Sequence, residues 1–333
     1  MATAVVHTSR EGKGQSSVLL DLYGYIGPSR NATTATSKTS AGLHIAVTFC
    51  AAHPPVLSHF SVDCPAWPEP KCWSLMPVVI AGDADLVLLR VPVNRSAKFD
   101  VRFSDYFVYR VHCQRPKLDL LPTSAPYYFQ DQEIVILSCG DGSYAVASIQ
   151  PLGKSTFTLH LYRSLPNGEP GTWTSKPVDV EEPLRHKVCP IPSSSGMPFC
   201  QETRNVITLG GAKGTVGWVD LWRGILLCDL LEESPKLRDM PLPLPSKANW
   251  NVYLDGCPYF SRNIIVNQRK DTIKYVEMEI SRAANPPVFA FSSDRYAYYE
   301  WLSHEECPSY FLVPSYHVES HHMEHANPDH FMD

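Results

Sequence analysis

The chain has little charge and no long apolar run. These two absences argue against nucleic-acid-binding and membrane-spanning proteins. Asp, Glu, Lys and Arg make up 19% of the 333 residues, and the net charge is −5. Because there is no broad basic field, we expect no nucleic-acid partner. No run approaches the ~18 apolar residues of a membrane-spanning helix, so we expect no membrane partner. The hydrophobic content of 44% is typical of a chain that folds around a core.

The chain also lacks any C-x-x-C pair, and its ten cysteines are dispersed. In a long chain this pattern indicates buried free thiols in a reducing compartment rather than a disulfide framework. Residues 1–17 lack the continuous apolar run of a secretory signal, and we interpret them as a disordered leader. We therefore expect an intracellular protein, cytoplasmic or nuclear. An organelle transit peptide remains an alternative, because the leader is mildly basic and contains Ser and Thr.

Helical periodicity is scarce, whereas short apolar or β-branched runs bounded by turn residues are frequent. Such runs recur about every 10 to 15 residues, which predicts an all-β fold. Only residues 294–306 resemble a short helix. We interpret residues 29–40 as a polar loop and residues 51–73 as an irregular crossing. The predicted strands are Val18–Ile26, Leu43–Cys50, Pro77–Ile80, Leu86–Val93, Phe99–Val111, Glu133–Cys139, Tyr144–Ile149, Thr156–Arg163, Thr172–Thr174, Ile207–Leu209, Val216–Trp222, Ile225–Leu231, Asn249–Leu254, Ile264–Asn267 and Ile273–Ile280.

The most informative segment is residues 214–231, GTVGWVDLWRGILLCDLL. Because strand side chains alternate, Val216, Trp218 and Trp222 are expected on one face, with Val219 and Leu221 on the other. Residues 223–224 supply a turn. The run that returns after the turn, residues 225–231, is apolar on both faces. Such a strand requires a packed layer on each side of the sheet. Packed propeller blades or the middle of a large sandwich would provide those layers.

Loose echoes recur along the chain, although no strict repeat is visible. LHLYRSLPNGEPGTWTSKPV and ILLCDLLEESPKLRDMPLP both run from strands to a proline-terminated exit. Such echoes suit propeller blades of about 40 to 50 residues, and the length would hold about six. The sequence therefore predicts a β-propeller-like domain of antiparallel strands.

Residues 218–231, WVDLWRGILLCDLL, and residues 237–245, LRDMPLPLP, resemble the signature of the DUF1618 family, which is expanded in grasses. LLDLYGYI at 19–26, RNATTATSKTSAG at 30–42 and VTFCAAHPPVLSHFSVDCP at 47–65 support the resemblance. Members of this family look like relatives of F-box-associated β-propellers and usually carry no enzymatic assignment. No F-box-like helical segment precedes the strands, so the resemblance does not imply a ubiquitin-ligase adaptor.

The resemblance implies a single propeller-like β domain of F-box-associated type over residues 18–316, with the DUF1618 signature at 214–310. Residues 317–333 are interpreted as a flexible His-rich tail. An incomplete last blade is an open alternative, because the terminal residues HHMEHANPDHFMD do not resemble the family. A truncated ring would lack the strand pairing that closes it.

Two patterns contain metal-binding residue types. His321, Glu324 and His325 match H-x-x-E-H, which binds zinc when both histidines share one face of a helix. The segment is polar and terminal, so a His-rich tail is the simpler interpretation. Residues 50, 53, 59 and 64 are Cys, His, His and Cys, but their spacing fits no standard zinc module. We expect no metal and no cofactor.

Other short motifs also have simpler interpretations. Asp83 and Asp85 could hold a cation, but Asp and Gly are also ordinary turn residues. Residues 12–17 and 209–215 are glycine-rich without matching the phosphate-binding loop G-x-x-x-x-G-K-[ST]. Residues 193–196 lack the G-x-S-x-G pattern of a nucleophilic serine. Trp218 and Trp222 could line a ligand groove, but core packing is their more common role.

No residue is therefore predicted to be catalytic, and the sequence favours a non-catalytic scaffold that binds unknown protein partners through loops. The alternative is a hydrolase-like enzyme with its site in the propeller channel. Acids and histidines that converge there with shifted pKa values would favour the enzyme. A third interpretation is a degenerate paralogue under weak constraint. The sequence does not predict the oligomeric state.

Overall fold

The fold was analysed in a computed structural model. It describes residues 4–8, 16–53, 55–65, 76–93, 104–111, 116–122, 130–140, 142–153, 155–166, 170–181, 183–184, 201–247, 249–250, 261–267, 269–279 and 317–324. Strands dominate these residues, so the predicted all-β class is confirmed. None of the helical residues described makes a helix of the length and apolarity needed to cross a membrane.

The N-terminal part contains a two-stranded hairpin and two four-stranded sheets. The hairpin consists of β1 (Ala4–Thr8) and β2 (Ser16–Leu20). The first four-stranded sheet has the order β3 (Tyr25–Ile26), β6 (His59–Asp63), β5 (His44–Cys50), β4 (Ala35–Lys38). The second is an antiparallel meander of β7 (Val78–Asp83), β8 (Leu86–Pro92), β9 (Ser104–Arg110) and β10 (Lys117–Leu121).

The middle of the chain forms two meanders that share one eight-stranded sheet. A 3-10 turn at Asp131–Glu133 precedes the first meander. That meander consists of β11 (Val135–Ser138), β12 (Tyr144–Pro151), β13 (Thr156–Arg163) and β14 (Thr172–Glu181). The second consists of β15 (Asn205–Gly210), β16 (Thr215–Asp220), β17 (Gly224–Asp229) and β18 (Leu237–Pro241). A short parallel pairing of β14 with β18 joins them, so each meander remains a distinct four-stranded unit.

A three-stranded antiparallel sheet completes the described strands. It consists of β19 (Arg262–Val266), β20 (Thr272–Glu279) and β21 (His317–Glu324). Residues 317–324, which the sequence analysis assigned to a tail, thus pair with β20. The division into a leader, a domain over 18–316 and a tail stays a prediction.

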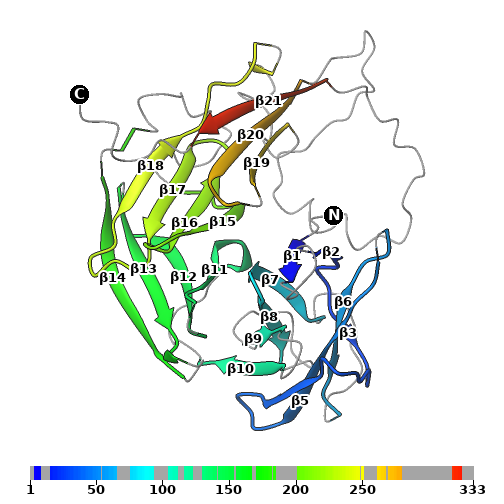
Figure 1. Cartoon of the computed structure of the whole chain (residues 1–333). Helices are drawn as coiled ribbons and strands as arrows, with labels where there is room; N and C mark the ends of the chain where they lie inside the picture. Colours follow the sequence, from blue (N-terminus) through cyan, green and yellow to red (C-terminus); the bar gives the residue numbers. More distant parts are fainter. Residues whose placement is uncertain are drawn as a thin grey trace, which may run out of the picture.

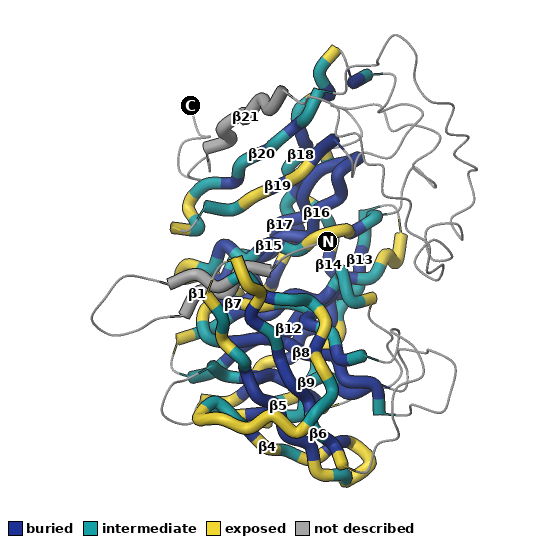
Figure 2. Tube along the Cα trace, turned by 90° about the vertical axis from the view of Figure 1, so that its right-hand side faces the viewer, coloured by how far each residue is buried: buried dark blue, intermediate teal, exposed yellow. Residues whose placement is uncertain are grey.

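The sheets follow one another around a common centre, from the blue first sheet to the orange hairpin β19–β20 (Figure 1). The first strand of each later unit lies toward that centre: β11 contacts β7 and β15, and β15 contacts β19. Strands β8, β16 and β17 are almost entirely buried (Figure 2), whereas β14 is exposed along much of its length. The chain therefore stacks successive sheets instead of closing one barrel.

Four apolar cores lie between consecutive sheets of the described part. Because strand side chains alternate, each internal sheet contributes to the core on either side of it. Each core draws members from two consecutive units, which are separate sheets or the two meanders of the eight-stranded sheet: Phe60 and Tyr109, then Val108 and Val146, then Ala147 and Trp218, then Leu227 and Tyr275. This layering supplies the two-sided burial that the apolar return run required.

The central hairpin confirms that prediction and corrects its turn. Leu226 and Cys228 of β17 lie in the core shared with β11–β14, whereas Ile225 and Leu227 lie in the core shared with β19–β20. The turn occupies residues 221–223 and not 223–224. Trp222 was predicted on a strand face beside Trp218, but it lies in this turn. The Asp220 carboxylate explains the difference, since it binds backbone N–H groups of the turn.

Several other predicted boundaries were wrong for a common reason. The polar loop predicted at 29–40 contains β4, and the irregular crossing predicted at 51–73 contains β6. The run Val18–Ile26 is split between β2 and β3, and the proline-rich exit after β17 contains β18. Strands with polar or proline-containing sequences gain their pairing from neighbours, which local patterning does not reveal. The helix predicted at 294–306 lies outside the described residues.

Gly224 begins β17 with φ of 145°, and a Cβ built there would lie 2.4 Å from the Met240 carbonyl oxygen. We expect Gly224→Ala to lower the free energy of unfolding by roughly 1–3 kcal/mol, because the backbone of β18 must move. Urea unfolding measures this change. Gly153→Ala is the control, since its added carbon would meet only an ordinary contact at 3.9 Å. Equal effects at both glycines would contradict the close approach of β18.

Candidate functional site

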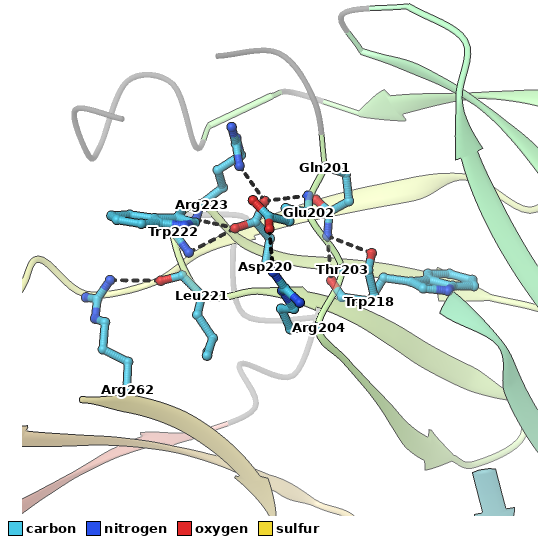
Figure 3. Close-up of polar contacts among 10 residues, drawn as sticks. All are labelled: Gln201, Glu202, Thr203, Arg204, Trp218, Asp220, Leu221, Trp222, Arg223 and Arg262. Carbon is cyan, nitrogen blue, oxygen red and sulfur yellow. Dashed lines mark hydrogen bonds and ion pairs between the residues drawn. The ribbon is translucent and has the colours of Figure 1, made fainter. Parts of the chain in front are cut away.

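The strongest concentration of buried polar groups surrounds the turn after β16 (Figure 3). Asp220 and Arg223 form an ion pair at 2.7 Å, with side chains 0% and 1% exposed. The Asp220 carboxylate also accepts hydrogen bonds from the backbone N–H groups of Glu202, Trp222 and Arg223, at 2.9 to 3.2 Å. All four donors belong to the protein itself. The Asp220 carboxylate therefore stabilises the conformation of the turn.

Arg262 extends this cluster to the next sheet. It donates to the carbonyl oxygen of Leu221 at 3.0 Å and to that of Pro243 at 2.5 Å. Its Nε donates to the Tyr275 hydroxyl at 2.7 Å, and its guanidinium lies 5.1 Å from the Tyr275 ring centre. Arg262 therefore fastens β19 to the turn after β16.

Tyr275 continues the chain of contacts into a buried carboxylate. Burial raises the pKa of the Tyr275 phenol, which stays protonated and donates to Glu277 at 2.5 Å. Glu277 also accepts from the Asn249 amide at 2.8 Å and from the Ser246 backbone N–H at 3.1 Å. We name the set Asp220, Arg223, Arg262, Tyr275 and Glu277 the buried polar network. These hydrogen bonds all join parts of the fold to one another.

A second polar group lies at the 3-10 turn before β11. Asp131 accepts from Arg90 Nε at 3.0 Å and from the Tyr106 hydroxyl at 3.4 Å. Burial raises the pKa of Asp131 despite the neighbouring Arg90. Burial also raises the pKa of Glu133 from its ordinary 4.5 to about 7. Among the described groups of polar residues, these two carboxyl groups are the best suited to act as general acids, because burial raises the pKa of both.

The raised pKa of Glu133 gives a pH-dependent stability. The folded state holds this proton more tightly, so the stabilisation is complete below about pH 4.5 and is lost as the pH rises through about 7. Above that range we expect Glu133→Gln to raise the free energy of unfolding by roughly 2–3 kcal/mol. Denaturant unfolding at several pH values measures the difference, with exposed Glu232→Gln as the control. A Glu133→Gln effect that does not vary with pH would contradict it.

A third group joins turns that are far apart in the sequence. Asp83, at the end of β7, accepts from the Ser138 backbone N–H at 2.8 Å and forms an ion pair with Lys270. Lys270 lies in the β19–β20 turn with φ of 58°, and the Asn267 carbonyl oxygen accepts its N–H at 3.0 Å. Asp83 thus connects the second and third four-stranded units to the last hairpin.

Loss of this connection should loosen the last hairpin. We expect Lys270→Gln to lower the free energy of unfolding by about 1 kcal/mol at low salt, and by less at high salt. Asp83→Ala should cost more, because it also removes the acceptor for Ser138. Urea unfolding at two salt concentrations tests both, with exposed Lys213→Gln as the control. A Lys270→Gln effect no larger than that control would contradict the connection.

The remaining motifs do not form sites. Within the described residues, no group of three or more His, Cys, Asp or Glu side chains is placed to hold a metal. Cys50 and His59 pair across β5 and β6, whereas Cys64 is a buried thiol in the first core. His321 and Glu324 lie on strand β21, so this part of H-x-x-E-H lacks the helix that the zinc motif needs. His325 lies outside the described residues.

The turn and loop motifs have structural roles where they are described. Asp83 and Asp85 do not form a shared cation site, because Asp83 binds Lys270 and Asp85 lies 3.8 Å from Arg110. Residues 209–215 connect β15 to β16 through glycines with positive φ, and no helix follows. Trp218 is core and donates to the Glu133 carbonyl oxygen at 2.8 Å. Residues 12–15 and 193–196 lie outside the described residues.

The described thiols agree in part with the prediction from the sequence. Cys50 and Cys228 are free thiols, and of the four described cysteines Cys64 and Cys228 are buried whereas Cys50 and Cys139 are partly exposed. Burial raises the pKa of Cys228 to about 12, and also raises that of Cys50. The other six cysteines lie outside the described residues. Cys228 is thus kept protonated and has the character of a core residue.

The sequence analysis missed Arg262, Glu277 and Arg90, because each acquires its partners from distant strands. Asp220 and Arg223 carried a local signal: a carboxylate three residues before an arginine, at a turn between apolar runs. This spacing lets a side chain bind both the turn backbone and the guanidinium.

The family comparison identifies the segment that holds the buried polar network. Residues 218–327 match DUF1618, described as a protein of unknown function. This match supports the family resemblance and begins at Trp218. All five residues of the buried polar network lie within the matched segment. The segment also includes the end of β16, all of β17 and the sheet β19–β21. No curated protein matches the chain.

A search of solved structures adds no argument about function. An endo-arabinase from Bacteroides thetaiotaomicron is 10% identical, with a TM-score of 0.24, over 64% of this chain and 75% of that chain. At this TM-score the likeness does not bear on the fold or the activity of the DUF1618 segment.

Proposed function

We propose that this chain is a non-catalytic protein-interaction scaffold, built as a propeller-like domain of about six blades. The observation that carries the proposal is that the charged side chains of the buried polar network bind other parts of the fold. Asp220 and Arg223 are buried and bind the turn, and Arg262 binds carbonyl oxygens of neighbouring segments. Groups used in this way support a rigid frame, on which surface residues are free to recognise partners.

Other features support the architecture and setting of the scaffold. Cores between consecutive sheets, with inner strands in contact around one centre, are typical of propeller blades. Free thiols support an intracellular location, cytoplasmic or nuclear. The resemblance beyond the matched segment supports a member of the plant family expanded in grasses. Exposed Tyr23, Tyr25 and Leu57 on the first sheet supply apolar surface for a partner.

Proximity labelling in the tissue that expresses the chain tests the scaffold. The full chain and a chain ending at Tyr316 are compared, with a free labelling enzyme as the background control. We expect a small, reproducible partner set that both chains share. A folded chain with no specific partners would contradict the scaffold. A partner set that is lost from the shorter chain would show that recognition depends on β21 or on the residues after it.

A hydrolase-like enzyme is the second candidate, and one observation favours it. Asp131 and Glu133 lie just before the inner strand β11, and burial raises the pKa of both. A protonated carboxylic acid near neutral pH is suited to general acid catalysis. A screen of glycoside, ester and phosphate-ester substrates tests this candidate. Turnover that Glu133→Gln abolishes while the chain stays folded would support the enzyme, whereas no turnover by the folded chain would contradict it.

A further inference from the structure

An acid and two exposed tyrosines lie where the chain enters the first sheet at β3. Asp21, Tyr23 and Tyr25 alternate in the sequence with Leu22 and Gly24, and the backbone bends at Leu22. Leu22 packs against the first core, and Gly24 is buried. Tyr23 and Tyr25 are 46% and 50% exposed, which is unusual for side chains of this size in a folded domain.

Two hydrogen bonds hold the Asp21 carboxylate beside Tyr25. Asp21 Oδ1 accepts from the Tyr23 backbone N–H, and Asp21 Oδ2 accepts from the Tyr25 hydroxyl, both at 3.1 Å. The hydrogen bond and the negative charge of Asp21 raise the pKa of Tyr25. The ring of His59 meets that of Tyr25 edge-on at 4.7 Å between centres. The acid and the tyrosines are therefore ordered before any partner binds.

Apolar side chains border this group. The Asp21 N–H donates to the Ser58 carbonyl oxygen at 2.8 Å, and the Ser58 N–H donates to that of Leu19 at 2.7 Å. This pairing places the backbone of Leu57 near that of Asp21. Leu57 and Val56 are both exposed. We name Asp21, Tyr23, Tyr25, Leu57 and His59 the acid–tyrosine patch.

The charge of Asp21 is not neutralised within the described residues. Asp63 on the same sheet pairs with Arg30 at 2.6 Å, and Asp220 pairs with Arg223. No ion pair to Asp21 is formed among the described residues. The Asp21 carboxylate offers ionic attraction, and the exposed rings of Tyr23 and Tyr25 nearby in the chain offer aromatic faces; both favour a cation.

We propose that the acid–tyrosine patch binds an arginine or lysine side chain of a partner protein, with an adjacent apolar residue of the partner against Leu57. The net charge of −5 favours approach of a basic segment. Arginine suits the patch better than lysine, because its planar guanidinium stacks on tyrosine and binds a carboxylate through two donors. This inference rests on the scaffold function and assigns its partner chemistry.

Fluorescence anisotropy of a labelled peptide tests the patch on the full chain. The probe is a short peptide of alternating leucine and arginine, and its control replaces arginine by neutral citrulline. We expect the arginine peptide alone to bind, with an affinity that falls as salt rises. Asp21→Asn and Tyr25→Ala should each weaken binding by about tenfold. Tyr25→Phe should weaken it less, because the ring remains.

Matched variants separate the patch from general charge attraction. Asp179→Asn removes an equal charge from exposed β14, and we expect it to leave binding within about twofold of the wild type. Thermal unfolding checks that each variant is folded. If Tyr25→Ala is unstable, Asp21→Asn carries the test. Equal weakening by Asp179→Asn, no effect of Asp21→Asn, or equal binding of the citrulline peptide would overturn the proposal.

The outcomes distinguish the patch from the scaffold on which it rests. Proximity labelling is repeated with Asp21→Asn beside the wild type. A partner set that is unchanged by Asp21→Asn, together with unaffected peptide binding, would overturn the patch and leave the scaffold intact. No specific partners for either chain would overturn the scaffold. Partners that Asp21→Asn loses in parallel with the peptide are the expected result.

Discussion

Asp220→Ala is expected to lower the free energy of unfolding by about 3–5 kcal/mol, because it leaves a buried arginine without its partner. The substitution removes the acceptor for Arg223 Nη1 and for three backbone N–H groups. Unpaired donors at this depth retain their desolvation cost without compensation. Urea unfolding followed by tryptophan fluorescence measures the loss.

Two controls separate this effect from a change of net charge. Lys236→Gln breaks an exposed ion pair with Glu181, and we expect no measurable change in stability. Asp220→Ala combined with Arg223→Leu should recover part of the stability, because no buried charge then remains. A near-neutral Asp220→Ala, or a double variant worse than both single variants together, would contradict the structural role of the pair.

Trp218→Ala and Leu227→Ala are each expected to cost roughly 2–5 kcal/mol, as truncations of buried side chains do. Trp218 lies in the core shared with β11–β14, and Leu227 lies in the core shared with β19–β20. The two variants therefore test opposite faces of one hairpin. Trp218→Ala also removes a hydrogen bond to the Glu133 carbonyl oxygen.

Ile265→Ala is the matched control for these truncations. Ile265 lies on β19 but is exposed, so its loss should change stability by less than about 0.5 kcal/mol. A small effect at Leu227 with a large one at Trp218 would mean that only one face of β17 is buried. Small effects at both would contradict the stacked sheets.

The central hairpin was predictable because its apolar residues are contiguous. The six apolar residues of the run 225–231 can be buried only between two layers, and the structure has a core on each side of β17. The turn was displaced in the prediction because Gly224 looked like a turn residue. Its positive φ instead begins the strand, and Asp220 builds the turn through its side chain.

Polar strands were the part that local pattern did not predict. Strand β4 has the sequence ATSK, and β6 has HFSVD. Neither is distinctive, but β5 between them pairs with both. Strand β18, in a proline-rich segment, likewise pairs with β17. Long-range pairing decides these strands, and it has no local signature in one sequence.

The candidate sites divide in the same way. Residues 84–85 and 211–214 form turns in the structure, and turn material was the simpler interpretation of both motifs. Arg262 could not be predicted as a bridge, because its acceptors at Leu221 and Pro243 approach only after the sheets stack. Asp21, Tyr23 and Tyr25 alternate in the sequence, but their exposure depends on which face the first core covers.

Hydrogen exchange of the native chain tests most directly whether residues 215–229 are interior structure rather than an accessible site. Mass spectrometry follows amides of β16 and β17 beside those of the polar strand β4. We predict that β16 and β17 exchange slowest, by global unfolding, and that Asp220→Ala accelerates them. Exchange of β16 and β17 as fast as that of β4 would contradict burial on both faces. It would return Asp220, Arg223 and Trp218 to the candidates for a binding site.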